Sequence, residues 1–152
     1  MSRVAAGGAP GWLDRHRSAV PLLGGFSLCH GDVNMKNILL CPGGGLRLID
    51  TESFKFLPCA IEYHRLAYGL CGFDGSLHEE FRKSYMAAAT GKTLREIERS
   101  GGYYHACVLL EIAWHFNKKL KREGLPEAER PAFARSRDAA LARLAELTDH
   151  NP

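Results

Sequence analysis

Pro58 divides this sequence into two patterns that belong to different kinds of secondary structure. Before it, apolar runs are only a few residues long and are bounded by glycine, proline or polar residues, which is typical of short strands. After it, apolar residues recur every three or four positions over long stretches, which indicates amphipathic helices. The chain is therefore expected to be α+β and mostly helical.

Three short runs are predicted to be strands. Residues 26–29 read Phe-Ser-Leu-Cys between glycines and a polar segment, which favours a buried strand. Residues 37–41 and 46–50 flank a Pro-Gly-Gly-Gly turn and predict a hairpin. Phosphate-binding loops also contain such glycines, but no helix follows this turn, so the hairpin is favoured.

Helical periodicity follows the strands, and a shorter helical stretch precedes them. We expect the strands to form a small platform on a helical body, in a single domain over residues 1–152. Residues 1–11 are rich in glycine and alanine and are expected to be disordered. The predicted helices cover residues 12–20, 61–71, 77–88, 102–122 and 127–147.

Charge and cysteine content exclude several classes of protein. The net charge of +3, from 20 basic and 17 acidic residues, is too small to predict a nucleic-acid partner, although it favours an anionic ligand slightly. The dense basic run at 118–122 is assigned to a solvated helix end. Five cysteines without a CxxC pair indicate free thiols in a reducing cytosol. No signal peptide or membrane span is recognisable, so a cytoplasmic location is expected.

Polar residues gather in two segments that border the predicted hairpin. His30 and Asp32 precede its first strand, which begins at Asn37, whereas Asp50 ends the return strand and Glu52 follows it. Asp50 stands 18 positions after Asp32, which leaves room for a loop, a strand, a tight turn and the return strand. Such a hairpin brings Asn37 and Asp50 to the same end of two adjacent strands, with Asp32 on the loop that faces them.

These residue types suit phosphoryl transfer, which requires positioning and charge neutralisation rather than covalent help from the protein. Asp50 and Asn37 are predicted to bind Mg²⁺, with Glu52 either a further acid near the metal or a surface residue. Asp32 is expected to accept or orient the proton of a substrate hydroxyl, and His30 to brace the loop. Turn-forming or capping roles are the alternative interpretation of the same side chains.

The segments His30-Gly-Asp32, Asn37-Ile-Leu and Ile49-Asp-Thr-Glu52 resemble the catalytic core of the aminoglycoside phosphotransferase and choline kinase family. The resemblance covers about 25 residues. It implies the C-terminal lobe of the protein-kinase-like fold, in which a small β-hairpin platform carries the catalytic and metal loops. It further implies ATP as phosphate donor, bound with Mg²⁺ by Asn37 and Asp50, and a small-molecule hydroxyl as acceptor.

The chain departs from this family in what precedes His30. Only 29 residues stand there, no lysine occurs before Lys36, and no GxGxxG pattern is present. We therefore expect a truncated C-lobe over residues 12–152, without the N-lobe that covers ATP, and completion by a separate N-lobe or protein partner. Members of the family often carry an aspartate soon after the second motif, and Glu62 is expected to replace it here.

Three functions are compatible with these patterns. The first is a small-molecule kinase, and the second is a non-catalytic, pseudokinase-like binding or regulatory module that uses an exposed apolar face. The third, a metal-dependent hydrolase, is disfavoured because the sequence offers no second cluster of ligands. The acceptor is not specified, but the resemblance places its pocket within residues 60–125. Candidates there by chemical type are Tyr63, Asp74, Glu79, Glu80, Tyr103 and Glu111.

Overall fold

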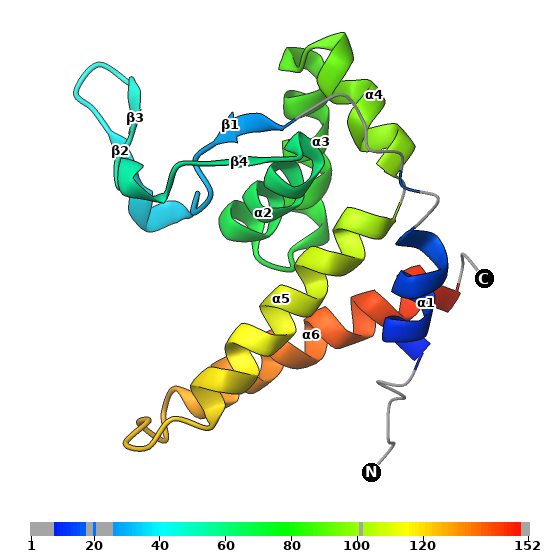
Figure 1. The fold of residues 1–152 in the computed structure, drawn as a ribbon. Coiled ribbons are helices and arrows are strands. Elements are labelled where there is room, and N and C mark those ends of the chain that lie inside the picture. The colour runs from blue at the N-terminus through cyan, green and yellow to red at the C-terminus, as the bar shows by residue number, and fades with distance from the viewer. Residues whose placement is uncertain (1–7, 18–19, 21–25, 101, 150–152) are drawn as a thin grey trace. The chain divides into compact units, whose positions relative to one another are not determined.

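The computed structural model describes residues 8–17, 20, 26–100 and 102–149, and it is α+β and mostly helical, as predicted (Figure 1). The sequence predicted a single domain over residues 1–152, whereas the contacts divide the chain into two compact units. One unit contains residues 22–100, and the other contains residues 1–21 with 101–152. Among the described residues, no helix is both long enough and apolar enough to span a membrane.

Four short strands in the unit of residues 22–100 form two antiparallel pairs (Figure 1). The predicted hairpin is confirmed: β2 (Ile38–Leu40) pairs with β3 (Leu46–Leu48) around a turn in which two glycines have positive φ. The other pair joins β1 (Ser27–Cys29) to β4 (Lys55–Leu57). Strand β4 was not predicted, because a three-residue segment that begins with lysine becomes recognisable as a strand only through its partner.

The predicted burial of the first strand is wrong for most of its length. Leu28 is 61% exposed and lies opposite Phe56, which is 68% exposed, whereas only Cys29 is buried. Helix α2 contacts β1, whereas Leu28 and Phe56 share a face of this two-stranded sheet that is open to solvent. An antiparallel sheet with one open face normally carries polar residues there, so the exposed apolar pair is unusual.

Three helices complete this unit: α2 (Cys59–Cys71), α3 (Gly75–Ala88) and α4 (Gly91–Ser100). The helix α2 packs against both of the others. The helices predicted over 61–71 and 77–88 are confirmed, but α4 was not predicted, because it begins at Gly91 and glycine more often ends a helix than begins one. The side chain of Asp74 caps α3 by accepting from two backbone N–H groups.

A buried carboxylate joins α4 to the beginning of α2. Helix α2 follows Pro58, whose side chain cannot accept a hydrogen bond, and Glu96 Oε1 accepts from the N–H of Ala60 at 3.2 Å instead. The positive end of the helix dipole also favours a carboxylate at this place. The pKa of Cys59 is raised to about 11, mainly by burial and secondly by a hydrogen bond with Glu96, so this thiol stays protonated at neutral pH.

The second unit consists of α1 (Gly8–Arg17), α5 (Tyr103–Leu120) and α6 (Arg130–Asp149). Helices α5 and α6 run side by side from a connecting loop, and α1 contacts both (Figure 1). The apolar residues at their contact are almost completely buried. Helix α1 begins at Gly8, so residues 8–11 are helical and not disordered as expected, while residues 1–7 lie outside the described chain. The buried core residues include Trp12, Val108, Leu109, Ala140 and Leu144.

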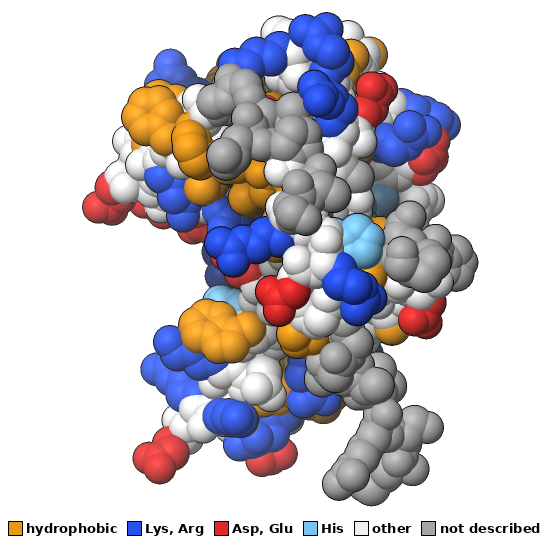
Figure 2. Space-filling view, turned by 45° about the vertical axis from the view of Figure 1, so that its right-hand side comes forward, with side chains coloured by type: hydrophobic (Ala, Val, Ile, Leu, Met, Phe, Trp, Pro, Cys, Tyr) orange, Lys and Arg blue, Asp and Glu red, His pale blue; other side chains and the backbone are white. Residues whose placement is uncertain are grey.

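Surface charges are interspersed and are paired mainly within single helices. On the face shown in Figure 2, Lys and Arg side chains lie among acidic and uncharged ones. Pairs such as Arg82–Glu79 and Arg143–Glu146 join residues three positions apart. Exposed pairs of this kind contribute at most about 1 kcal/mol each, so the stability of both units depends mainly on buried apolar residues and buried hydrogen bonds.

Replacing Glu96 by alanine is expected to lower the free energy of unfolding by roughly 1–3 kcal/mol, because the buried N–H of Ala60 and the thiol of Cys59 lose their acceptor. Urea denaturation followed by circular dichroism measures the change. Glu98 lies exposed on the same helix, and its replacement by alanine is expected to change stability by less than about 0.5 kcal/mol. Equal destabilisation in both variants would contradict this account of α4.

Candidate active site

The loop that follows β1 lies along helix α2 and contacts it at two points. The N–H of Gly31 donates to Glu62 Oε1 at 3.1 Å, and the backbone of Val33 lies directly against Gly69. Glu62 and Gly69 are seven positions apart, about two helical turns, and therefore share one face of α2. A side chain at position 69 would collide with the carbonyl oxygen of Val33, which explains a glycine in the middle of this helix.

Gly31 has the second backbone constraint in this loop. Its φ is +82°, a conformation that residues with a side chain rarely adopt. A Cβ atom there would also collide with the carbonyl oxygen of Ser53 and with the side chain of Lys55. Both the torsion angle and the space therefore require glycine between His30 and Asp32.

His30 connects the loop to the segment that carries Asp50. Its ring is buried, and Nε2 lies 2.8 Å from the carbonyl oxygen of Ile49, to which it donates. The ring also packs edge-on against Phe54, with 5.2 Å between the ring centroids. These contacts fix the residue before Asp50 relative to the loop, which is the geometry that a bracing histidine requires.

The structure brings together three of the predicted site residues. Asn37 Nδ2 donates to the carbonyl oxygen of Asp32 at 2.8 Å and to its Oδ2 at 3.3 Å, and it lies 3.5 Å from Asp50 Oδ2. The N–H of Ile49 donates to the carbonyl oxygen of Asn37 at 2.9 Å, which extends the hairpin ladder to the site. The side chains of Asp32 and Asp50 are exposed, so a ligand can reach both carboxylates.

Asp50 has an uncommon backbone conformation. Its φ of 65° and ψ of 49° are left-handed, and within the described ranges it is the only residue other than glycine with positive φ. Aspartate tolerates this region better than most residues, although the conformation still costs about 1 kcal/mol. Such local strain often occurs at functional sites, and here it places the carboxylate just beyond β3, near Asn37.

The donor set suits Mg²⁺ better than a transition metal. Asn37 Oδ1 makes no hydrogen bond within the described chain, so an amide oxygen and the carboxylate of Asp50 are available. Mg²⁺ prefers oxygen donors and commonly takes only one or two from the protein. Among the residues described, no group of three or more His, Cys, Asp and Glu side chains could hold a metal ion.

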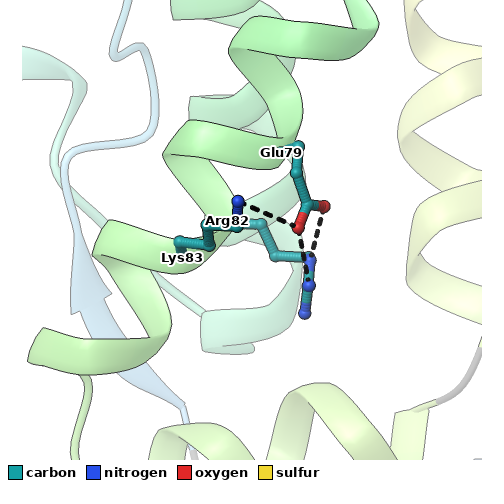
Figure 3. A network of polar contacts seen from close by, with 3 residues as sticks. All are labelled: Glu79, Arg82 and Lys83. Carbon is teal, nitrogen blue, oxygen red and sulfur yellow. Dashed lines mark hydrogen bonds and ion pairs between the residues drawn. The ribbon is translucent and has the colours of Figure 1, made fainter.

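Glu52 and the acceptor candidates are not gathered at this site by any described contact. Glu52 is exposed in the 3₁₀ turn η2 (Thr51–Ser53) and forms no hydrogen bond or ion pair with the described residues. Glu79 binds Arg82 at 3.0 Å and Lys83 at 3.9 Å on the surface of α3 (Figure 3). Of the others, Asp74 caps α3, Tyr63 is buried against Phe81 and Tyr85, Glu80 is exposed, and Tyr103 and Glu111 belong to the other unit.

Two residues of the site were not selected in the sequence analysis. Gly69 could have been found as a glycine inside a helical pattern, which usually has a packing reason. Asn34 could have been found as a side chain of the capping type two positions after Asp32. Glu62 was selected as the replacement for an aspartate that the family often carries. In the structure it contacts the loop by accepting the hydrogen bond from the N–H of Gly31.

Comparisons with known proteins add no relative. No protein-family model matches the chain, and neither the curated proteins nor the solved structures gave a match.

Replacing Gly69 by alanine is expected to destabilise the protein by roughly 1–3 kcal/mol, because the new methyl group collides with the backbone of Val33. Gly75 provides a matched control, since it begins α3 with open space around its Cα. Alanine at position 75 is expected to be neutral or to stabilise by up to about 1 kcal/mol. Thermal denaturation compares the two variants, and similar melting temperatures would contradict a tight contact between α2 and the loop.

Proposed function

We propose that this chain is a small-molecule kinase that transfers the γ-phosphate of ATP to a hydroxyl group in a magnesium-dependent reaction. In this proposal, residues 22–100 carry the catalytic and metal loops of a protein-kinase-like C-lobe of the aminoglycoside phosphotransferase and choline kinase type. The observation that carries the proposal is the convergence of Asp32, Asn37 and Asp50 around one amide group.

The proposed roles follow from the donor and acceptor properties of each side chain. Asn37 Oδ1 and the Asp50 carboxylate would hold Mg²⁺, which when bound neutralises the charge of the phosphate oxygens. The Asp32 carboxylate would accept or orient the proton of the attacking hydroxyl. Asn37 uses Nδ2 to bind Asp32, and its Oδ1 makes no hydrogen bond within the described chain, so one amide could serve both functions.

The rigid support of the loop favours a catalytic role over a simple turn. Gly31 and Gly69 permit close backbone contacts, and partly buried hydrogen bonds with Glu62 and Ile49 hold the two residues that precede Asp32. A surface turn does not require such support, whereas phosphoryl transfer depends on accurate positioning.

A binding module without catalysis is the second candidate, and the apolar surface of the hairpin favours it. Ile38, Leu40, Leu46 and Leu48 share one face of the hairpin through their cross-strand pairing. Leu40 is 75% exposed and Leu46 is 70% exposed. Exposed apolar surfaces of this kind frequently bind other proteins.

Isothermal titration calorimetry with ATP, in the presence and absence of Mg²⁺, tests the proposed function. The wild-type protein is expected to bind ATP more tightly with Mg²⁺, and Asp50→Asn is expected to weaken that binding roughly 10- to 100-fold through loss of a charged ligand. Asparagine also tolerates the left-handed backbone at this position, so the variant should retain its fold.

Asp138→Asn is the matched control, because Asp138 is an exposed acid of α6 that pairs with its neighbour Arg137. This control is expected to bind as the wild-type protein does. Mg²⁺-dependent binding that is equally strong in Asp50→Asn would contradict the assigned metal site. Absence of ATP binding by folded wild-type protein would favour the binding module, for which both Asp32→Asn and Asp50→Asn should be harmless.

A further inference from the structure

Asn34 contacts the catalytic loop through both ends of its side-chain amide. Its Oδ1 accepts from the N–H of Lys36 at 2.9 Å and thereby caps the 3₁₀ turn η1 (Met35–Asn37). Its Nδ2 donates to Asp32, at 3.2 Å to the carboxylate Oδ1 and at 3.3 Å to the carbonyl oxygen. A single side chain therefore connects the carboxylate of Asp32 to the turn that ends at Asn37.

The cap determines which end of the amide faces Asp32. A backbone N–H requires an acceptor, so the oxygen of Asn34 must point to Lys36 and the NH₂ group must point the other way. Asp32 then receives one amide donor on each carboxylate oxygen, from Asn34 on Oδ1 and from Asn37 on Oδ2. Donors on both sides restrict rotation of the carboxylate about its terminal bond.

The backbone of Asn34 is fixed as well. A Cβ atom at Gly69 would lie 3.6 Å from the Cα of Asn34, and the preceding residue, Val33, is buried. Helix α2 therefore holds the chain on one side of Asn34, and η1 holds it on the other. The side-chain amide of Asn34 therefore contacts Asp32 from a backbone that is fixed on both sides.

We propose that Asn34 is a positioning residue that orients the Asp32 carboxylate toward the attacking hydroxyl. The inference rests on the proposed function for its catalytic meaning, although the contact itself can be measured separately. It predicts that position 34 needs an acceptor toward Lys36 and a separate donor toward Asp32, and the amide of asparagine supplies one at each end.

Substitutions at position 34 separate capping from positioning. Serine and aspartate are both good caps, but serine lacks the amide NH₂ group that donates to Asp32, and aspartate places a second carboxylate beside Asp32. Using hydrolysis of ATP without added acceptor as the assay, we expect Asn34→Ser to lower kcat roughly 10- to 100-fold. We expect Asn34→Asp to lower kcat further, and neither substitution to change KM for MgATP, because Asn37 and Asp50 remain. Wild-type kcat in the serine and aspartate variants would show that Asn34 is a cap only and would overturn the inference.

Nuclear magnetic resonance tests the contact without any activity. The side-chain NH₂ signal of Asn34, assigned by its loss in Asn34→Ser, is expected to shift in Asp32→Ala and to stay in place in Asp138→Ala. An unmoved signal in Asp32→Ala overturns the inference, whether or not the protein hydrolyses ATP. A shifted signal in a protein that neither binds nor hydrolyses ATP would instead count against the proposed function and, with it, against the catalytic meaning of the contact.

Discussion

The hydrogen bond from the N–H of Gly31 to the buried carboxylate of Glu62 joins the polar loop to helix α2, and the arrangement of the site depends on it. The second oxygen of Glu62 is buried without a hydrogen-bond partner among the described residues. A buried polar atom in that condition costs roughly 1–3 kcal/mol. The fold retains this carboxylate because its other oxygen fixes the loop at Gly31. The ring of His30 also fixes the loop, through its hydrogen bond to Ile49. Asp32 then extends to solvent from a backbone that is supported on both flanks.

A hydrogen bond from a distant part of the sequence also stabilises the beginning of a helix. Helix α3 has a local cap from Asp74, whereas α2 follows a proline and takes its acceptor from Glu96 on a different helix. A cap supplied from a distant part of the sequence makes the start of α2 depend on α4. Because α2 also carries Glu62 and Gly69, the packing of α4 influences the support of the loop, although α4 contributes no side chain to the site.

Local patterns predicted those parts of the molecule that depend on neighbouring residues. The hairpin over 37–50 followed from its glycine turn, and the gathering of Asp32, Asn37 and Asp50 followed from the hairpin. Strand β4 and helix α4 were missed, because β4 depends on pairing with β1 and α4 begins at a glycine that commonly ends a helix. Exposure of Leu28 could not be read from its type, since burial depends on what covers the sheet. The roles of the site residues remain predictions.

The short strands have a consequence for how a ligand would be held. A two-stranded hairpin is only marginally stable in water, and β2 and β3 have three residues each. Asn37 directly precedes one strand and Asp50 follows the other, so opening of the hairpin separates them. Asn37 and Asp50 lie together only in molecules whose hairpin is closed. The apparent affinity for a ligand is therefore the intrinsic affinity multiplied by the fraction of molecules with a closed hairpin. By the same linkage, a ligand that bridges Asn37 and Asp50 would stabilise the closed hairpin and slow amide hydrogen exchange along it.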